Sequence, residues 1–254
     1  MSKSSAIKGK RYWLVGASTG IGAALAEELA KRGAKVAVSA RSEKELTELA
    51  GDTMTAVPLD VTDPAAVQAA AETVRTELGG IDAVVYSAGY WKQFDASKWD
   101  AEIFARHIEV NLLGFNSVIA AVLPEMVKNR SGHIIGIASV AGYRGLPGSE
   151  AYGATKAAQL NMLEAMRGSL KSKNIRITTV SPGFVRTPMT AVNEFPMPFL
   201  IDADEAAEAI ADGLEARRSE IVFPLPMALM MKATNLVPVG LWGSVSARLN
   251  KPAK

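Results

Sequence analysis

Three side chains suited to proton transfer fall within one short stretch of the chain: Ser139, Tyr152 and Lys156. A phenol has an ordinary pKa near 10, so at neutral pH it exchanges protons poorly unless its anion is stabilised. An ammonium about 4 Å away supplies roughly 4 kcal/mol at an effective dielectric constant of about 20, which equals about three pKa units. We therefore predict that Lys156 lowers the pKa of Tyr152 and makes it an acid–base group.

The elements expected around these residues bring them together. Residues 132–138 form a nearly continuous apolar run, as in a parallel strand buried on both faces, so Ser139 lies at the carboxyl end of a strand. Ligands of open α/β sheets bind at that edge. Residues 151–170 have helical spacing, and side chains four residues apart project from one helix face. A lone Tyr-x-x-x-Lys pair is more often structural, so other motifs must support the chemistry.

A glycine-rich turn near the amino terminus supplies a second signal. Residues 12–15 form a short apolar strand, and an Ala- and Leu-rich helix runs from the turn to about residue 32. Glycine permits a tight turn at Gly16, close approach of a pyrophosphate at Gly20 and close helix packing at Gly22, while the helix amino terminus attracts the anion. Three glycines between a strand and a helix therefore predict a dinucleotide site.

With Asn111, these residues resemble the motifs of the short-chain dehydrogenase/reductase family. The resemblance covers about residues 9–223 and includes Gly-x-x-x-Gly-x-Gly, the asparagine, the serine and Tyr-x-x-x-Lys in the family's order. Val15 stands where the family usually has threonine, a structural brace, and residues 87–89 read Ser-Ala-Gly where the family usually reads Asn-Asn-Ala-Gly. The resemblance implies a Rossmann-type, doubly wound α/β fold with a seven-stranded parallel sheet in the order 3-2-1-4-5-6-7, flanked by helices.

We expect residues 1–254 to form one domain, because no linker or low-complexity run divides the chain. Helices should begin at the capping residues Ser42, Asp63 and Asp202: glutamate follows the first and third by three positions, and proline directly follows the second. The remaining expected strands are residues 35–39, 54–59, 82–86, 175–180 and 220–223, and the remaining long helices are residues 102–126 and 202–217.

Arg41, directly after the second expected strand, favours NADP(H) over NAD(H). An acidic residue there would accept hydrogen bonds from a ribose 2′-hydroxyl, whereas an arginine pairs with a 2′-phosphate. Thr19 stands where NADP-preferring relatives often carry a second basic residue, so NAD(H) remains the alternative. By resemblance, the cofactor contacts are expected to be Gly16, Ser18, Thr19, Gly20, Ile21, Gly22, Arg41, Ser42, Asp60, Val61, Ala88, Gly89, Asn111, Tyr152, Lys156, Pro182, Gly183, Val185 and Thr187.

The resemblance also implies a catalytic role for four residues. Tyr152 exchanges a proton with the oxygen of a carbonyl or secondary alcohol, and Ser139 fixes that oxygen by a hydrogen bond. Lys156 lowers the tyrosine pKa and binds the nicotinamide ribose, and Asn111 helps to hold a water that relays protons from the lysine. Without the resemblance, Asn111 would be interpreted as a tolerated polar residue in the helix expected over residues 102–126.

The composition limits the classes of function. Lys and Arg total 28 against 26 Asp and Glu, so we expect no nucleic-acid partner. Cysteine is absent and the histidines are His107 and His133, so we expect no metal site and a redox reaction would need an organic cofactor. The amino-terminal residues lack the apolar segment of a signal peptide, so we expect a cytoplasmic protein.

Apolar residues near the expected site indicate a hydrophobic small-molecule substrate. Residues 189–200 form a Met- and Phe-containing loop where relatives carry a mobile lid, and Tyr90 and Trp91 form a pocket wall or an interface pair. Residues 224–254 add two short apolar helices separated by Pro238. These helices pack on the cleft or on another subunit, since relatives are commonly homodimers or homotetramers, or they contact a membrane surface without crossing it.

Two other classes of function stay open: a non-enzymatic NADP-binding sensor, and a membrane-peripheral scaffold on the same fold. The combination of Asn111, Ser139, Tyr152 and Lys156 favours an enzyme over a sensor, because a sensor has no need of a phenol with a tuned pKa.

Overall fold

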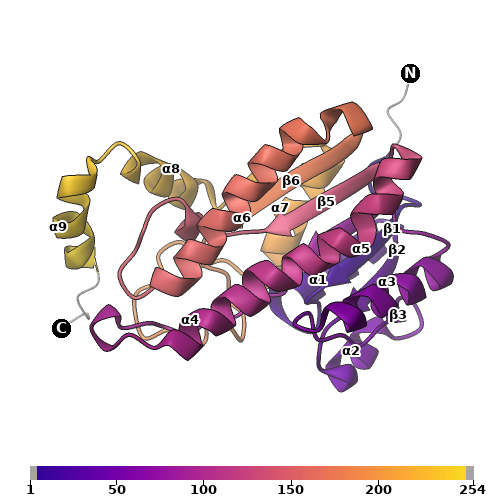
Figure 1. Ribbon diagram of the computed structural model, residues 1–254, viewed down its shortest axis with the longest axis horizontal. Helices are drawn as coiled ribbons and strands as arrows, with labels where there is room; N and C mark the ends of the chain where they lie inside the picture. The colour runs from indigo at the N-terminus through magenta and orange to yellow at the C-terminus, as the bar shows by residue number, and fades with distance from the viewer. Residues whose placement is uncertain (1–4, 250–254) are drawn as a thin grey trace.

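The computed structural model describes residues 5–249, and its central element is a parallel sheet with the strand order β3-β2-β1-β4-β5-β6-β7. The predicted fold class and strand order are therefore confirmed (Figure 1). The strands are β1 (Arg11–Val15), β2 (Lys35–Ser39), β3 (Thr55–Ala56), β4 (Ala83–Tyr86), β5 (Gly132–Ile137), β6 (Ile175–Pro182) and β7 (Glu220–Phe223). The α-helices are α1 (Gly20–Lys31), α2 (Glu43–Ala50), α3 (Pro64–Leu78), α4 (Ala101–Ile108), α5 (Gly114–Asn129), α6 (Glu150–Ser169), α7 (Ala203–Glu215), α8 (Leu225–Thr234) and α9 (Val239–Leu249).

Helices cover both faces of this sheet (Figure 1). On one face α1, α2 and α7 pack in a buried cluster that includes Leu25 and Val38. On the other face α3, α5 and α6 pack in a second cluster around Trp13 and Phe115. Successive side chains of a strand point to opposite faces, so a strand covered on both sides must be apolar throughout. This explains why all four residues of β4 are buried.

The third strand is shorter than the predicted residues 54–59. β3 contains two residues, but extended backbone continues beside β2. The N–H groups of Val57 and Leu59 donate to carbonyl oxygens of β2 and of the residue just after it, both at 2.9 Å. This extension carries the chain to Asp60 at the carboxyl edge of the sheet.

One long helical segment, Ala101–Asn129, spans the predicted residues 102–126. Its middle part, η2 (Glu109–Leu113), is a π-helical turn with Asn111 at its centre. A π-helical turn replaces the usual i−4 hydrogen bonds by i−5 bonds, and such turns occur often at functional sites. Helical spacing in the sequence predicted the segment but not the turn, because one inserted residue barely changes the apolar pattern.

The three predicted helix caps have different outcomes. The Asp63 carboxylate accepts hydrogen bonds from the N–H groups of Ala65 and Ala66, with proline at the first helical position, as predicted. α2 and α7 begin directly after Ser42 and Asp202, as predicted, but the side chains of these two residues make no capping bond. Asp202 instead accepts a hydrogen bond from Arg186 Nε at 2.8 Å, and Ser42 lines a cavity.

Two helices, α8 and α9, follow β7 and lie beyond the end of the sheet (Figure 1). Met227 and Met231 of α8 pack with Val140 in the short helix η3 (Val140–Gly142), which follows β5. Trp242 of α9 donates from Nε1 to Gly145 O at 2.6 Å. One side of this pair of helices is therefore attached to the loop that carries Ser139. Residues 250–254 of the predicted extension lie outside the described residues.

Candidate active site

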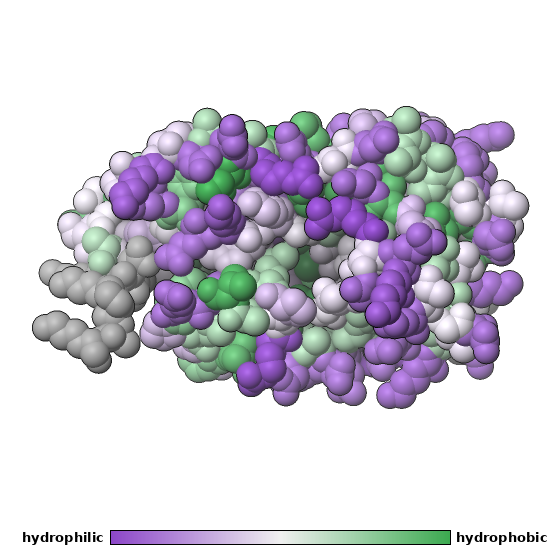
Figure 2. Space-filling model, turned by 90° about the horizontal axis from the view of Figure 1, so that it is seen from below, coloured by the Kyte–Doolittle hydropathy of each residue, from purple (hydrophilic) through white to green (hydrophobic). Residues whose placement is uncertain are grey.

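A cavity of about 560 Å³ lies at the carboxyl edge of the sheet. The surface is hollowed near the middle of one face, with apolar atoms at the floor of the hollow and hydrophilic residues at its border (Figure 2). Asn111 is the one predicted site residue that does not line the cavity, because it is buried in contacts with other residues. The predicted residues that line the cavity are Gly16, Ser18, Thr19, Gly20, Ile21, Gly22, Arg41, Ser42, Asp60, Val61, Ala88, Gly89, Ser139, Tyr152, Lys156, Pro182, Gly183, Val185 and Thr187.

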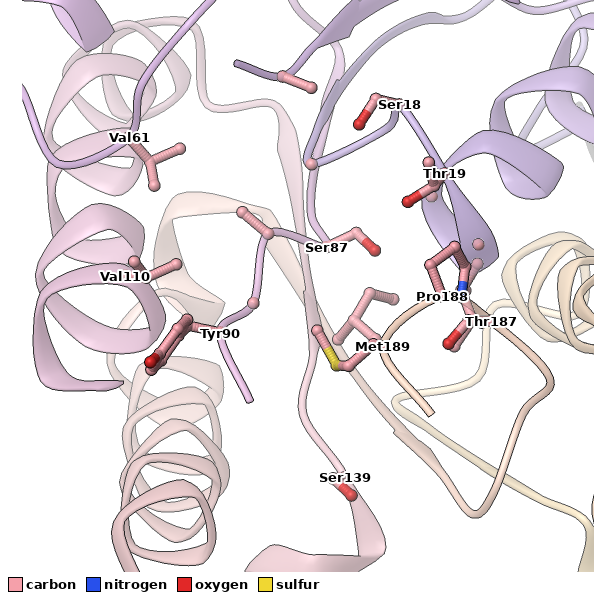
Figure 3. A pocket seen from close by; sticks show the side chains of 18 of the residues that line it. Ser18, Thr19, Val61, Ser87, Tyr90, Val110, Ser139, Thr187, Pro188 and Met189 are labelled. Atoms are coloured by element: carbon pink, nitrogen blue, oxygen red, sulfur yellow. The ribbon is translucent and has the colours of Figure 1, made fainter. Parts of the chain in front are cut away.

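The two ends of the cavity differ in chemistry (Figure 3). Ser18 and Thr19 of the glycine-rich turn lie at one end, Ser139 lies at the other, and the side chain of Met189 lies between them. The residues labelled along one side wall are Val61, Val110 and Tyr90. Apolar side chains and the hydroxyl groups of Ser87 and Thr187 therefore lie between the two ends.

The glycine-rich turn is packed so closely that side chains would not fit at two positions. Gly16 has φ +88°, and a Cβ atom there would lie 2.2 Å from Ala88 N. A Cβ atom at Gly22 would lie 2.1 Å from Gly16 O. These contacts let α1 begin directly at the cavity, where its first turn holds no acidic residue and no side chain caps it. The positive end of the helix dipole and free N–H groups suit a pyrophosphate, so this end of the cavity fits a dinucleotide.

The other end of the cavity brings the hydroxyl, the phenol and the amine together. Ser139 accepts a hydrogen bond from Ala141 N at 3.1 Å, which fixes its hydroxyl at the start of η3. Tyr152 and Lys156 lie on consecutive turns of α6, and the amine nitrogen lies 5.5 Å from the centre of the tyrosine ring. The predicted convergence is therefore present in the structure.

The pKa of Tyr152 is shifted opposite to the predicted direction. Burial raises it to about 12, and an interaction with the Ser139 hydroxyl offsets this rise only in part. Burial also lowers the pKa of Lys156 to about 7. The amine donates to Ile137 O at 2.8 Å and to Gln159 Oε1 at 3.1 Å. The lysine charge alone would lower the pKa of Tyr152, whereas the buried surroundings disfavour both charged forms.

Asn111 connects three segments around the site. Its side-chain oxygen accepts from Tyr90 N at 2.7 Å, and its side-chain nitrogen donates to Tyr90 O at 3.1 Å and to Thr155 Oγ1 at 2.9 Å. Its backbone carbonyl accepts from Gln159 Nε2 at 2.6 Å. Asn111 therefore holds the loop after β4 against α6, and its carbonyl has a protein donor.

A carboxylate and two arginines lie near the end of the cavity beside β2 and β3. Asp60 accepts hydrogen bonds from the N–H and hydroxyl groups of Thr62, which lower the pKa of the carboxyl group. The charges of Arg41 and Arg106 lower this pKa further. Arg106 comes from α4 and forms an ion pair with Glu109 at 3.1 Å. The structure thus adds a second basic residue that the sequence analysis did not name.

Aromatic residues form the wall beside Tyr152. The Trp91 ring lies edge to face with the Tyr152 ring at 5.3 Å, and Trp91 Nε1 donates to Asn193 Oδ1 at 2.9 Å. Tyr90 lines the cavity and packs against His107 at 4.7 Å. Tyr90 therefore lies at the pocket wall, as one of its two predicted roles requires, whereas Trp91 packs behind Tyr152 and does not itself line the cavity. Trp91 also joins this wall to the loop predicted to be a lid.

Some lining residues were not predicted as site residues. Most of these adjoin a predicted residue in the same loop, so extending each motif by one or two positions would have found them. Arg106 and Val110 differ, because they lie four residues apart on one helical face and only the tertiary structure shows that this face meets the cavity. The additional lining residues are Ala40, Leu59, Ser87, Tyr90, Arg106, Val110, Ile137, Ala138, Pro188, Met189 and Thr190.

Known proteins share this sequence pattern and fold. The family model of the short chain dehydrogenases matches residues 10–195. An uncharacterised oxidoreductase of Myxococcus xanthus is 36% identical over 242 residues, which cover 93% of this chain and 96% of that protein. A 3-oxoacyl-(acyl-carrier-protein) reductase of Vibrio cholerae is 35% identical over 218 residues, which cover 81% of this chain and 89% of that protein.

A solved structure of similar fold contains a nicotinamide cofactor. It is a 3-ketoacyl-(acyl-carrier-protein) reductase from Brucella melitensis complexed with NADH, with a TM-score of 0.79 and 27% sequence identity. The match covers 85% of this chain and 97% of that chain.

Proposed function

The chain belongs to the short-chain dehydrogenase family, whose members are oxidoreductases with a fold that binds a nicotinamide cofactor, and on this premise we propose that it transfers a hydride between NADP(H) and a hydrophobic carbonyl compound or secondary alcohol. The observation that carries this proposal is the convergence of Ser139, Tyr152 and Lys156 at one end of a cavity whose other end is the glycine-rich turn. This arrangement suits proton transfer to a carbonyl oxygen beside a bound dinucleotide.

The cofactor, when bound, supplies or accepts the hydride. The turn from Gly16 to Gly22 and the amino terminus of α1 would hold its pyrophosphate, because backbone N–H groups and the helix dipole favour an anion there. Thr187 and the backbone at Pro182 and Gly183 would hold the nicotinamide end, since all three line the cavity and Pro182 O lies 3.5 Å from Ser139 Oγ.

In the reducing direction Tyr152 gives its proton to the carbonyl oxygen, and Ser139 hydrogen-bonds to that oxygen. Burial keeps the phenol protonated at neutral pH, so the acid is present in the required form. The phenolate that remains favours the charged form of Lys156, because opposite charges in a buried site stabilise each other. Asn111 helps to position Tyr152 and Lys156 through Thr155 of the same helix, to which it donates a hydrogen bond.

Arg41 and Arg106 support NADP(H) rather than NAD(H). Both lie at the end of the cavity that holds Asp60, and both act on its carboxylate. A 2′-phosphate brings a second anion to this end, and guanidinium groups pair well with phosphate oxygens. The NADH in the Brucella melitensis reductase makes NAD(H) the alternative for this chain.

The substrate is proposed to be a hydrophobic ketone, aldehyde or alcohol. Trp91 and Met189 lie beside the reacting end, and the ring of Phe195 in the lid loop packs with Phe184 at 6.0 Å. The related reductases of Vibrio cholerae and Brucella melitensis are named for 3-oxoacyl and 3-ketoacyl groups, which contain a carbonyl on an aliphatic chain. Reduction of such a carbonyl fits both the wall and the acid–base group.

Assembly and location are further parts of the proposal. We propose that residues 1–254 act as one domain, because α8 and α9 are attached to the loop that carries Ser139. We further propose that this domain forms a cytoplasmic homodimer or homotetramer. The outer side of α8 and α9 is proposed to contact a membrane surface. Exposed apolar residues on this side are Leu225, Leu229, Met230, Leu236, Val239, Leu241 and Val245. Residues 224–254 also carry four basic residues and no acidic residue, which favours an anionic surface.

Only one helical segment among the described residues, Ala101–Asn129, is long and apolar enough to cross a membrane by length and composition. Its α5 part packs on α3 and on the sheet, as a core helix does, so it is weak evidence for a membrane span. The proposed membrane contact therefore depends on α8 and α9 alone.

A screen of hydrophobic ketones and aldehydes, followed by the absorbance of NADPH, tests the enzymatic function. With an active compound, Tyr152→Phe should lower kcat roughly 10³-fold, because the proton donor is lost. The Kd for NADPH, measured by fluorescence titration, should stay within about threefold. Tyr143→Phe is the matched control, since Tyr143 bonds to Glu220 and does not line the cavity, and it should keep kcat.

Two outcomes would contradict the enzymatic proposal. Full activity of Tyr152→Phe would remove the phenol from the reaction. Binding of NADPH without turnover of any carbonyl compound or alcohol would favour the NADP-binding sensor instead.

A further inference from the structure

Gln159 links the active-site amine to the π-helical turn, and the proposed reaction assigns it no role. It lies three residues after Lys156 on α6 and is completely buried. Its Oε1 accepts from Lys156 Nζ at 3.1 Å, and its Nε2 donates to Asn111 O at 2.6 Å. A buried amide is costly unless both of its ends are paired, and here both partners belong to the site.

The partner carbonyl is itself held in place. Asn111 lies in the π-helical turn, where the backbone hydrogen-bond pattern departs from that of an α-helix. The Asn111 side chain bonds to both backbone groups of Tyr90 and to Thr155. The Gln159 amide is therefore anchored to the fixed carbonyl of Asn111, and the amide in turn fixes the position of the Lys156 amine.

Resting on the proposed oxidoreductase function, we propose that Gln159 is a positioning residue, whose amide fixes the Lys156 amine beside Tyr152 and stabilises its charged form. A carbonyl oxygen that accepts a hydrogen bond from an ammonium favours the charged form. The amide accepts at oxygen and donates at nitrogen, so it holds the amine in place but passes no proton between its two partners.

Few other groups can set the charge of this amine. The groups that face it or its neighbour are Tyr152 on α6, His107 on α4 at 6.4 Å from the Tyr152 ring, and the Ile137 carbonyl of β5. Glu109, at the start of the π-helical turn, is exposed and paired with Arg106. Burial lowers the pKa of both Lys156 and His107. The oxygens of Ile137 and Gln159 are thus the neutral acceptors that oppose the effect of burial on the amine.

The test is an NMR titration of the full chain labelled with ¹³C-lysine. The Lys156 side-chain signal is assigned by its absence in Lys156→Met. Gln159→Met keeps the length and volume of the side chain but removes the carbonyl oxygen, so the titration midpoint of Lys156 should fall by about one pH unit. Gln159→Glu places a carboxylate at the same position, so the midpoint should rise by about one pH unit.

Opposite shifts distinguish positioning from structural damage, because damage alone would not reverse with the charge of the new side chain. Asn161→Met is the matched control, since Asn161 is exposed on the same helix, and its midpoint should equal that of the unmodified chain. Gln159→Leu provides a second apolar variant and should lower the midpoint as Gln159→Met does. Midpoints that stay within about 0.2 pH units, or that move in the same direction in the Met and Glu variants, would overturn the proposal.

The titration needs no substrate, so it separates two failures. With an active carbonyl compound, the alkaline limb of the pH profile of kcat/KM should move in the same directions as the midpoints. If the midpoints shift as expected but the chain reduces no carbonyl compound, the proposed function is contradicted. Gln159 is then still the residue that holds the amine. Unchanged midpoints in an active enzyme would contradict only the role of Gln159.

Discussion

The buried amine and phenol of the active site each resist taking a charge. Burial lowers the pKa of Lys156 to about 7 and raises that of Tyr152 to about 12. A phenolate formed at Tyr152 would raise the pKa of the amine, so the two protonation states are coupled. The ammonium is consequently stabilised most when the tyrosine has given up its proton.

Replacing the buried lysine should stabilise the fold in a pH-dependent way. The unfolded amine has a pKa near 10.4 and the folded amine about 7, so between these values the unfolded chain binds a proton that the folded chain does not. The lysine's contribution to stability therefore rises with pH over this window and is least favourable below pH 7. Lys156→Met should raise the free energy of unfolding by about 2–3 kcal/mol more at pH 6 than at pH 9.

Urea denaturation at the two pH values measures this difference. Lys44→Met is the control, because Lys44 is exposed on α2, and its effect should be the same at both pH values. An equal effect of Lys156→Met at pH 6 and pH 9 would show that the amine titrates normally in the folded chain.

Arg41 should decide the choice between the two nicotinamide dinucleotides. Arg41→Asp removes a guanidinium group that can pair with a 2′-phosphate and introduces a carboxylate that repels it, so KM for NADPH should rise at least tenfold. KM for NADH should change much less, since NADH has a 2′-hydroxyl in place of the phosphate. Steady-state kinetics with both cofactors test this prediction.

Lys44→Asp makes the same change of charge nearby on an exposed position of α2 and serves as the control for Arg41→Asp. If both substitutions raise KM for NADPH equally, the effect is a general one of charge. If Arg41→Asp raises KM for NADPH and NADH by the same factor, Arg41 does not select the cofactor.

At the scale of the elements, three residues at helix starts differ in whether their side chains form a capping bond. Asp63, Ser42 and Asp202 have the residue types of helix caps, but only Asp63 bonds to the free N–H groups of its helix. Asp202 pairs with Arg186 across the start of α7, and both side chains are largely exposed. Of the two aspartates, Asp63 caps its helix and Asp202 instead pairs with an arginine.

The two aspartates should consequently contribute differently to stability. Asp63→Ala should lower the free energy of unfolding by about 1 kcal/mol, because two N–H groups lose their acceptor. Asp202→Ala breaks an exposed ion pair and should cost less than about 0.5 kcal/mol. Urea denaturation of both variants at neutral pH measures the costs, and equal losses would show that Asp202 caps α7 in solution.

For the molecule as a whole, α8 and α9 have two different sides. The inner side packs on η3 and on the loop at Gly145, while the outer side exposes leucines and valines. The four basic residues of 224–254 give this segment a positive charge, although the chain as a whole has a formal net charge of only +2. Apolar and basic residues together favour contact with the headgroups of an anionic membrane.

Acidic substitutions on the outer side should weaken this contact. The double variant Leu229→Asp and Leu241→Asp should lose most of its cosedimentation with vesicles of 30% phosphatidylglycerol in phosphatidylcholine, because carboxylates oppose both apolar burial and the anionic surface. Leu113→Asp is the matched control, since Leu113 is a similarly exposed leucine of η2, outside α8 and α9, and it should bind like the unmodified chain.

Size-exclusion chromatography of the same variants separates membrane contact from subunit contact. A change of oligomeric state in the double variant, without loss of vesicle binding, would identify the outer side as a subunit interface. If neither vesicle binding nor oligomeric state changes, both the membrane contact and the subunit contact of the outer side are contradicted.

The sequence by itself determined the order of strands and helices, the glycine-rich turn and the residues of the reacting end. Most of these features depend on local causes: the spacing of apolar residues sets each element, and glycine allows the close contacts of the turn. The order of the strands within the sheet came from the resemblance to the short-chain dehydrogenase/reductase family. Residues such as Gly16 and Tyr152 could therefore be found from their neighbours along the chain.

Only the tertiary structure decided the electrostatics and the connections of the site. The pKa of Tyr152 depends on burial by segments far apart in the sequence, so its direction could not be read from a lysine four residues away. Arg106 and Gln159 reach the site because α4, the π-helical turn and α6 pack together at the edge of the sheet. Such contacts are set by the way the helices pack on each other, which the spacing of residues along one helix does not specify.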